Sequence, residues 1–472
     1  MTANISERLR AELGPAFSGR TSGPGDENYD RDRKVWNATV DKYPALIAEC
    51  KSQADVSAAV RASRELDVAL SVRGGGHQVA GLSVCDGLVV DLAGMRTGAV
   101  DPARRVARVG GGSLLSDVDK LTQQRGLMTP AGVISHTGLG GLALGGGVGW
   151  TCRNFGLTCD NIVAADLVTA DGDLLRVSEH QEPEVLWALR GGGGNFGVVT
   201  TFELTLHEVA DVLFGQAVFA LGDAAEAMNQ YRDVMADAPD ELTAVLVLRA
   251  APPLPAVPPH LIGHPVVMVN VAWSGAVEQG ETPVRRLIEN SPSVASRIAR
   301  QPYLKLQAMQ DGFHPHGMYN YMKSRYLTGL DDRAIDALLA AASTAPGPHS
   351  QIEVLRLGGA VGRVPTNATA FSGRDAHFIA NVGATWTDSS DRNDHIDWAR
   401  RVYASLDHVG SDAGCINFLG EEPERARSVY SGTTYERLQK VKARLDPYEV
   451  FRGNIAIRLT EPTQNPISGI DR

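Results

Sequence analysis

Glycine is gathered into three tracts within the first 200 residues, and this constrains the fold more than any other feature of the chain. There are 50 glycines in 472 residues, whereas an average content of about 7% would give about 33. The tracts lie at 74–76, 138–149 and 191–194. Glycine has no Cβ and so permits close backbone approach, but it costs about 1 kcal/mol relative to alanine inside a helix. The tracts therefore predict loops around a ligand or another backbone, not long helices.

The first two tracts allow two interpretations as a nucleotide site. The sequence GLGGLA at 138–143 fits a GxGxxA dinucleotide fingerprint, with Asp160 placed 20 residues after Gly140. A Rossmann motif needs a helix directly after its glycines, and further glycines at 145–147 and 149 fall inside that helix. The alternative is a phosphate-binding nest of backbone N–H groups in the loop RGGGH at 73–77. A ligand that touches both tracts would be a dinucleotide cofactor, although each tract alone also fits a tight turn in a glycine-rich sheet.

Composition and charge exclude several classes of protein. The chain has 45 basic and 55 acidic residues and a net charge of -10, which argues against a nucleic-acid partner. The N-terminal segment is charged where a signal peptide is apolar, and the uncharged stretch at 126–152 is too rich in glycine for a membrane span, so we expect no membrane partner and a cytoplasmic location. Neither a zinc site nor a disulfide framework is predicted, because no CxxC pair occurs among the five cysteines, Cys50, Cys85, Cys152, Cys159 and Cys415.

The hydrophobic pattern divides the chain at about residue 208. Before it, helices are predicted at 55–65 and 113–125, the second capped by Ser113, and strands at 68–72, 87–92, 106–109, 162–168 and 174–177. After it, helices are predicted at 224–235, 331–342 and 435–445, and strands at 243–248, 266–273, 352–357 and 377–386. A loop with six prolines is predicted at 252–265. We therefore predict a cofactor domain over 1–208 and a substrate domain over 209–424, and composition alone does not assign the rest.

Three segments resemble the flavin domain of one family. They are SVRGGGHQVAGLSVCDGLVVDL at 71–92, TPAGVISHTGLGGLALGGGVGWTCRNFGLTCDNI at 129–162 and LRGGGGNFGVVTTFEL at 189–204. The family is the vanillyl-alcohol-oxidase type of flavoprotein, with a PCMH-type FAD-binding domain, in its berberine-bridge-enzyme-like branch. The C-terminal run from YERL at 435–438 through Asp446-Pro447 to Phe451 and Asn454 resembles that branch's final signature. The N-terminal half is most similar to bacterial members such as hydroxynicotine oxidases and antibiotic-tailoring oxidases.

The resemblance implies an α+β fold of two domains, with 425–472 returning to the FAD-binding domain and a substrate domain of antiparallel sheet backed by helices. It implies that His77 carries FAD through a covalent bond. Some members add a second bond from a cysteine, and Ile134 occupies that position here, so we predict a single link. Cys152 and Cys159 lie downstream of this position and are interpreted as buried small residues.

The family pattern also implies a set of cofactor contacts. They cover the pyrophosphate loop, a second contact stretch, the adenosine or ribityl portion, and the C-terminal tail. Besides His77, the predicted contacts are Arg73, Gly74, Gly75, Gly76, Gln78, Val79, Gly81, Ser83, Pro130, Ala131, Gly132, Thr137, Gly138, Gly140, Gly141, Gly146, Trp150, Asn161, Ile162, Gly197, Val198, Val199 and Asn454.

Substrate oxidation needs a proton acceptor close to the flavin. Glu353 is the first candidate, because an inward-facing Glu in the strand QIEVLR would be costly unless it were used; a surface Glu on an edge strand is the alternative. His136 is a second candidate, and a core histidine is its alternative. Asn381 aligns with the family position whose Gln or Glu faces substrate, and as an amide it is not a base. Thr137 aligns with the position that tunes oxygen access.

Two aromatic positions of the family differ here: Val79 replaces a Tyr found in several members, and Phe418 occupies a position where relatives often carry Tyr. Because Thr137 is small, the resemblance favours an oxidase that takes hydride from an alcohol, amine, sugar or secondary metabolite and reduces O2 to H2O2. The alternatives are a dehydrogenase that passes electrons to another acceptor and a flavin carrier without turnover. Fold does not choose the substrate, and no oligomeric state follows from the sequence.

Overall fold

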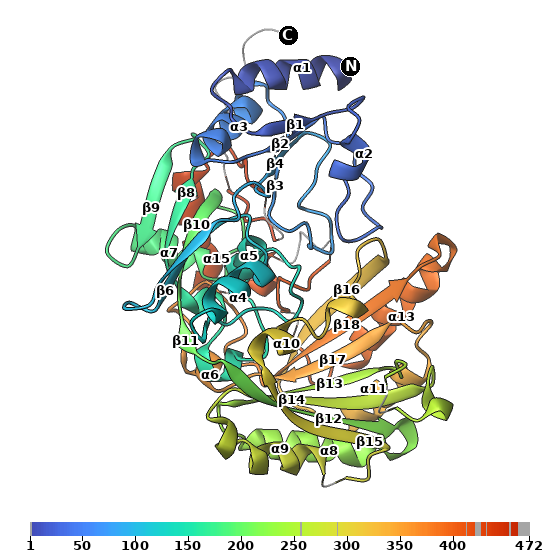
Figure 1. Ribbon diagram of the computed structural model, residues 1–472. Helices are drawn as coiled ribbons and strands as arrows, with labels where there is room; N and C mark the ends of the chain where they lie inside the picture. The colour runs from blue at the N-terminus through green and yellow to red at the C-terminus, as the bar shows by residue number, and fades with distance from the viewer. Residues whose placement is uncertain are drawn as a thin grey trace.

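The computed structural model describes residues 2–254, 257–289, 291–411, 413–420, 426–430, 432–452 and 455–460. Two smaller sheets and one seven-stranded sheet follow one another along the long axis of the molecule (Figure 1). The N-terminal helix α1 (Thr2–Leu13) lies at one end of this axis, and the seven-stranded sheet lies at the other. Within the described residues, no helix is both long enough and apolar enough to span a bilayer.

The first sheet holds the strand that leads into the RGGGH loop. Its strands are β1 (Arg20–Ser22), β2 (Leu46–Glu49), β3 (Leu70–Arg73) and β4 (Leu88–Asp91), in the order β1-β2-β4-β3. The strands β2, β4 and β3 run parallel, and β1 pairs antiparallel with β2. Helix α3 (Gln53–Glu65) buries Val56 and Val60 against this sheet, and its N-terminus is capped by Ser52, whose hydroxyl accepts the Asp55 N–H.

The second sheet is antiparallel and positions the other two glycine tracts. Its strands are β5 (Gly98–Asp101), β6 (Val106–Gly110), β8 (Ile162–Val168), β9 (Leu174–Ser178) and β10 (Val198–Thr205), in the order β5-β6-β10-β8-β9. A small pair, β7 (Leu127–Met128) and β11 (His207–Glu208), lies beside it. Its helices are α4 (Leu115–Gln123), α5 (Leu139–Gly145), α6 (Cys152–Phe155) and α7 (Pro183–Leu189).

The third sheet has seven antiparallel strands in the order β15-β12-β14-β13-β17-β18-β16. These are β12 (Asp211–Ala220), β13 (Leu242–Ala250), β14 (Pro265–Trp273), β15 (Ala295–Pro302), β16 (Tyr319–Leu327), β17 (Gln351–Arg356) and β18 (Phe378–Trp386). The main helices that follow these strands are α8 (Ala224–Ala236), α9 (Glu281–Ile288), α11 (Asp332–Ser343) and α13 (Arg392–Ser405). The remaining short helices are α2 (Tyr29–Asp32), α10 (Tyr303–Gln307), α12 (Ala360–Arg363) and α14 (Ala426–Val429).

The two faces of the seven-stranded sheet belong to different hydrophobic cores. One face, with Leu246 and Val354, packs against the helices α8, α9, α11 and α13. The opposite face, with Val247 and Met268, shares its core with Trp150 of the N-terminal part of the chain. Because successive strand residues point to opposite faces, every second residue of β13 and β17 is directed toward the glycine tracts.

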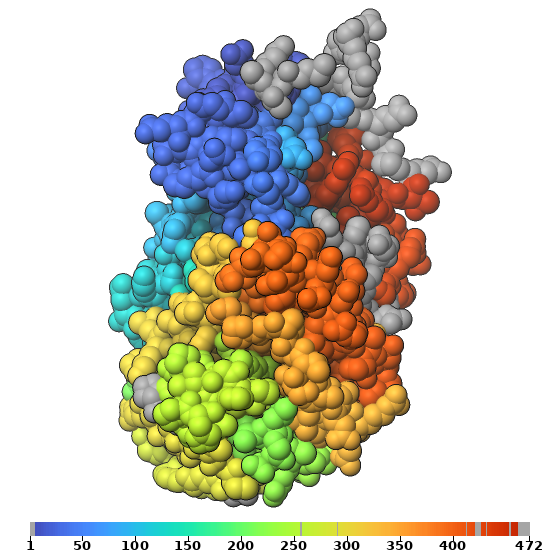
Figure 2. Space-filling view, turned by 90° about the vertical axis from the view of Figure 1, so that its right-hand side faces the viewer, coloured from blue at the N-terminus to red at the C-terminus, as the bar shows by residue number. Residues whose placement is uncertain are grey.

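The C-terminal helix α15 (Thr433–Leu445) returns to the N-terminal part of the chain. It packs against α7, and Figure 2 shows the red tail beside blue N-terminal residues on the surface. The ammonium group of Lys442 is buried, and it donates to Asp446 at 2.5 Å, to the Asn195 carbonyl at 2.8 Å and to the Phe451 carbonyl. A buried charge needs such partners, and these contacts fix the tail against the third glycine tract.

The α+β class and the antiparallel sheet backed by helices are confirmed, and the boundaries 1–208 and 209–424 stay a prediction. The helices and strands predicted from periodicity are all present, with ends shifted by a few residues. The predicted cap at Ser113 is wrong: the helix begins at Leu115, and Asp117 accepts the Leu114 N–H. The second tract contains only the seven-residue helix α5. This helix ends at Gly145, because the next residue, Gly146, has a φ of +131°. Several strands of the structure were not predicted from the sequence, among them β12, β15 and β16 of the seven-stranded sheet.

Candidate cofactor and active site

A cavity of about 270 Å³ lies where the three glycine tracts meet the seven-stranded sheet. The loop after β3, the start of α5 and the loop before β10 form one side of it, and Met322 and Glu353 approach from the sheet. The lining includes sixteen of the predicted site residues, namely Gly74, Gly75, Gly76, His77, Gln78, Val79, Ser83, Gly132, Thr137, Gly138, Gly140, Gly141, Gly197, Val198, Val199 and Glu353.

The first two tracts touch each other through bare backbone. A Cβ built on Gly138 would lie 2.2 Å from the Gly75 nitrogen, and a Cβ on Gly75 would lie 2.4 Å from the Gly138 nitrogen. Real Cβ atoms do not approach backbone so closely, so only glycine fits at both positions. Gly138 is further held by an isolated β-bridge to Leu114. This contact joins the loop after β3 to the segment before α5, and both glycines line the cavity.

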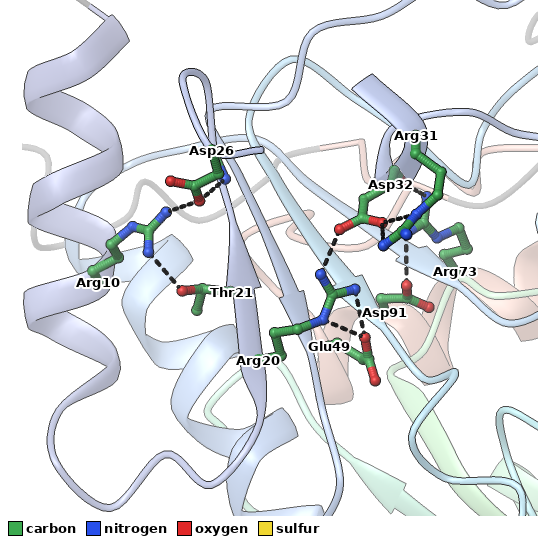
Figure 3. Close-up of polar contacts among 10 residues, drawn as sticks. Arg10, Arg20, Thr21, Asp26, Arg31, Asp32, Glu49, Arg73 and Asp91 are labelled. Atoms are coloured by element: carbon green, nitrogen blue, oxygen red, sulfur yellow. Dashed lines mark hydrogen bonds and ion pairs between the residues drawn. The ribbon is translucent and has the colours of Figure 1, made fainter. Parts of the chain in front are cut away.

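Arg73 lies just before the first tract but does not line the cavity. Its guanidinium donates to Asp91 at 2.6 Å and to the Asp32 carbonyl at 2.7 Å, as Figure 3 shows. Both members of the Arg73–Asp91 pair are nearly buried. Arg73 therefore anchors the strand end from which the glycine loop departs.

His77 ends the first tract with its imidazole inside the cavity wall. Its ring stacks on Trp36 with 4.3 Å between centroids and an interplanar angle of 15°, and it faces His136 at 5.0 Å. The His77 Nε2 atom is buried and has no hydrogen-bond partner. Burial lowers the pKa of His77 well below its usual value, and the neighbours His136, His314 and His316 lower it further. The imidazole is therefore neutral at physiological pH.

A row of polar side chains crosses the sheet beside the cavity. Arg249 stands opposite Gln351 on the neighbouring strand, and Glu353 stands opposite Asn381, which in turn stands opposite Ser324. The Arg249 guanidinium donates to Gln351 Oε1 at 3.0 Å, and Gln351 Nε2 donates to Glu353 Oε1 at 3.0 Å. The hydroxyl of Ser324 donates to Asn381 Oδ1 at 2.8 Å. The predicted residues Glu353 and Asn381 therefore belong to one hydrogen-bonded row.

Glu353 lies deep in the protein, and the exposed part of its side chain faces the cavity. Burial raises the pKa of its carboxyl, while the charge of Arg249 and a hydrogen bond from the Asn381 amide oppose that rise. His314 also lines the cavity, and burial lowers its pKa to about 4. Among the lining residues that the structure describes, Glu353 is the one carboxyl side chain.

Several predicted residues lie outside the lining. Asn161 donates to the carbonyls of Phe155 and Leu157, and its Oδ1 contacts His207, so its polar atoms hold the local chain. His136 packs against His77 behind the wall, and its Nδ1 is buried without a partner. Asn454 lies outside the described residues. The other predicted residues that do not line the cavity are Gly81, Pro130, Ala131, Gly146, Trp150, Ile162 and Asn381.

The cavity also contains residues that the sequence did not predict as site residues. Gly193 and Gly194 belong to the third tract and could have been found from it. Trp36 and His314 come from irregular loops and carry no periodic signal. The segment 416–418 closes another side and is tied to the second tract by Asn417, which accepts the Gly147 N–H at 3.1 Å and donates to the Leu142 carbonyl at 3.1 Å.

The residues present fit FAD. The cavity is lined by glycines of all three tracts, so it offers bare backbone to a ligand, and it places a neutral imidazole with an unpartnered nitrogen in its wall. Ile134 lines the same cavity at the position of a possible second link. Cys152 and Cys159 are buried outside the lining, and burial raises the pKa of both thiols, so neither is a ready nucleophile.

Comparison with known proteins also indicates an FAD-binding protein. Residues 44–178 match the FAD binding domain family, and residues 416–458 match the family described as berberine and berberine like. The chain is 30% identical over 475 residues to (R)-6-hydroxynicotine oxidase of Paenarthrobacter nicotinovorans, covering 96% of this chain and 99% of that one.

Solved structures extend the agreement to the whole fold. A crystal structure of 6-hydroxy-D-nicotine oxidase from Arthrobacter nicotinovorans superposes with a TM-score of 0.85 at 29% identity, covering 94% of this chain and 98% of that one. Glucooligosaccharide oxidase of Acremonium strictum, described with a 6-S-cysteinyl, 8α-N1-histidyl FAD, superposes with a TM-score of 0.83 at 23% identity, covering 97% and 100%.

Fold and site together define a two-domain, PCMH-type FAD-linked oxidoreductase, and FAD is its cofactor. The chain belongs to the berberine-bridge-enzyme-like family of these enzymes. The resemblance drawn from the glycine tracts and the C-terminal signature is therefore confirmed.

The contact between the glycine loops can be tested by adding a side chain at Gly138. Gly138→Ala places a methyl group against the Gly75 backbone, so we expect the loops to separate, the flavin bound per chain to fall, and stability to drop by about 1–3 kcal/mol or more. Absorbance of purified protein and thermal unfolding measure the two effects. The control is Gly222→Ala, at an exposed glycine where an added Cβ would meet no atom within 4 Å. Normal flavin content and an unchanged midpoint in Gly138→Ala would contradict this account.

Proposed function

We propose that the protein is an oxidase that removes hydride from a small organic substrate and reduces O2 to H2O2. Its FAD is attached to His77 through one covalent link. The observation that carries this proposal is that one cavity is lined by both His77, whose Nε2 atom has no hydrogen-bond partner, and Glu353. The hydroxynicotine and glucooligosaccharide oxidases support a small-molecule substrate. An alcohol, an amine, a sugar or a secondary metabolite all fit this proposal.

The chain's own residues supply binding and orientation, while FAD supplies the hydride acceptor and the site of O2 reduction when bound. The backbone N–H groups of the glycine loops would contact the pyrophosphate. Because burial keeps His77 neutral, its imidazole retains a lone pair with which to hold the flavin. Ile134 at the alternative position supports one link instead of two. The predicted contacts outside the lining, such as Trp150 and Ile162, remain proposals for the more distant parts of FAD.

Glu353 is the proposed general base. Its carboxyl faces the cavity and would take the proton of the substrate's hydroxyl or amine. The amides of Gln351 and Asn381 hydrogen-bond to that carboxyl and hold it in one orientation, so Asn381 would position the base. His136 is not in the lining and packs on His77, which favours a role at the flavin attachment over proton abstraction from substrate.

The oxygen half-reaction distinguishes the oxidase from its alternative, a dehydrogenase with another acceptor. Thr137 lines the cavity with a small polar side chain, at the position that the family resemblance assigns to oxygen access. A small side chain leaves space for O2 beside the flavin, which supports the oxidase.

We expect Glu353→Gln to slow anaerobic flavin reduction by about 10²–10⁴-fold, because general bases contribute that much. In the unmodified enzyme, reduction should slow as the pH falls through the pKa of Glu353, since only the ionised carboxyl accepts a proton. Burial places this acidic limb above the usual Glu value of 4.5, and the limb should vanish in the variant. Stopped-flow absorbance measures both. Glu226→Gln, at an exposed residue of α8, is the control. An unchanged rate of flavin reduction in Glu353→Gln would show that Glu353 is not the general base.

We also expect the reduced enzyme to react with O2 faster than free reduced FAD in the same buffer, with release of H2O2. Anaerobic reduction followed by mixing with oxygenated buffer measures the rate, and a peroxidase-coupled assay measures the product. Thr137→Leu should slow this step, because the larger side chain fills space in the cavity. Reoxidation no faster than that of free flavin would favour the dehydrogenase.

A further inference from the structure

Trp36 holds the imidazole of His77 and is itself held by a distant loop. The indole is almost fully buried and stacks on the His77 ring at 4.3 Å. Its Nε1–H donates to the His314 carbonyl at 2.9 Å. Its backbone N–H donates to the Gly76 carbonyl at 3.0 Å, and its own carbonyl accepts the Gly317 N–H at 3.1 Å. Trp36 thus connects the first glycine tract to the loop that leads into β16.

The neighbouring residue strengthens the same connection. Asn37 is fully buried, and its Nδ2 donates to the Val79 carbonyl at 2.6 Å and to the Asn320 carbonyl at 3.0 Å. Its Oδ1 accepts the Asn320 N–H at 2.9 Å. One side chain therefore bridges the segment after His77 and the first residues of β16, which fixes the position of Trp36 on both sides.

A second ring that contacts the His77 imidazole is supported by the same loop. His136 faces His77 at 5.0 Å, and the preceding residue, Ser135, is bound by Asp311. The Asp311 carboxylate accepts the Ser135 N–H at 2.8 Å and the Ser135 hydroxyl at 2.6 Å. The segment 311–320 thus supports both Trp36 and His136, two ring neighbours of the imidazole.

We propose that Trp36 is a positioning residue for flavin attachment: its indole, locked by the segment 311–320, fixes the ring of His77 in the orientation that bonds the flavin. Attachment would replace a C–H bond of a flavin methyl group by a bond to the His77 nitrogen; the electron pair would pass to the flavin ring system, and O2, the acceptor of the proposed function, would remove it. This rests on the proposed covalent link at His77. The His77 Nε2 atom has no hydrogen-bond partner, and the hydrogen bond that acts on the ring comes from the backbone of His77 itself, so the packing of neighbouring rings contributes to its orientation. A misplacement of about 1 Å can cost about 100-fold in rate, so loss of the stacking partner should impair attachment more than it impairs FAD binding to the glycine loops.

The test compares the covalent and total flavin of purified holoenzymes. Acid precipitation separates flavin bound to the pellet from flavin released into the supernatant. We expect nearly all flavin of the unmodified enzyme in the pellet, and at least a tenfold lower covalent fraction in Trp36→Leu, with FAD still bound before acid treatment. Trp36→Phe keeps a stacking ring and should retain most of the covalent flavin. Trp36→Met, which fills the space without a ring, serves as a second variant if Trp36→Leu does not fold, and the same loss is expected for it.

Trp187→Leu is the matched control. Trp187 is also buried, and its Nε1–H donates to the Asn367 carbonyl at 2.9 Å, but it does not line the cavity. It should lose stability in thermal unfolding without a change in covalent fraction. Trp36→Leu or Trp36→Met with an unchanged covalent fraction overturns the positioning role and leaves the proposed function intact. Acid-soluble flavin in the unmodified enzyme overturns the covalent link and the positioning role together.

Discussion

The cavity depends on two backbones that meet with no side chain between them. Gly75 lies in the loop after β3, and Gly138 immediately precedes α5, so their contact brings the RGGGH loop against the start of that helix. Any larger residue at either position would push these two segments apart. The other elements stabilise this contact from outside: Arg73 anchors the strand end, and Lys442 fixes the tail near the third tract.

The seven-stranded sheet contributes the proposed proton acceptor, Glu353, because alternate residues of its strands face the cavity. The cavity-facing side of the sheet is mostly apolar, but it carries four polar residues on three neighbouring strands: Arg249, Gln351, Glu353 and Asn381. Strand register places each of them beside the next. The Gln351 amide separates the guanidinium from the carboxylate and bonds to both. The Glu353 carboxyl is thus held by hydrogen bonds and not by a direct ion pair with Arg249. This arrangement suits a residue that is proposed to accept a proton.

The glycine tracts could be found from the sequence because close backbone contact admits only glycine. Family, cofactor and fold class followed from the resemblance of these tracts and of the C-terminal signature to one family. The irregular parts were harder to predict: Trp36 and His314 reach the cavity from loops without periodicity, and their proximity arises only when distant segments meet. Glu353 was named from alternation in a single strand, but the nearby charge of Arg249, which opposes the rise in the pKa of Glu353, becomes visible only through strand register. Strand β16 was missed because its apolar and polar residues do not alternate.

The proposed covalent link at His77 is tested most directly by mass spectrometry of the peptide that contains this residue. The peptide is obtained by acid precipitation and proteolysis of the purified protein. We expect a yellow precipitate and a single flavin-sized mass increase on that peptide, with the peptides of Ile134, Cys152 and Cys159 unmodified. A colourless precipitate with all FAD in the supernatant would contradict the covalent link at His77. A flavin mass on a second residue would contradict the single bond.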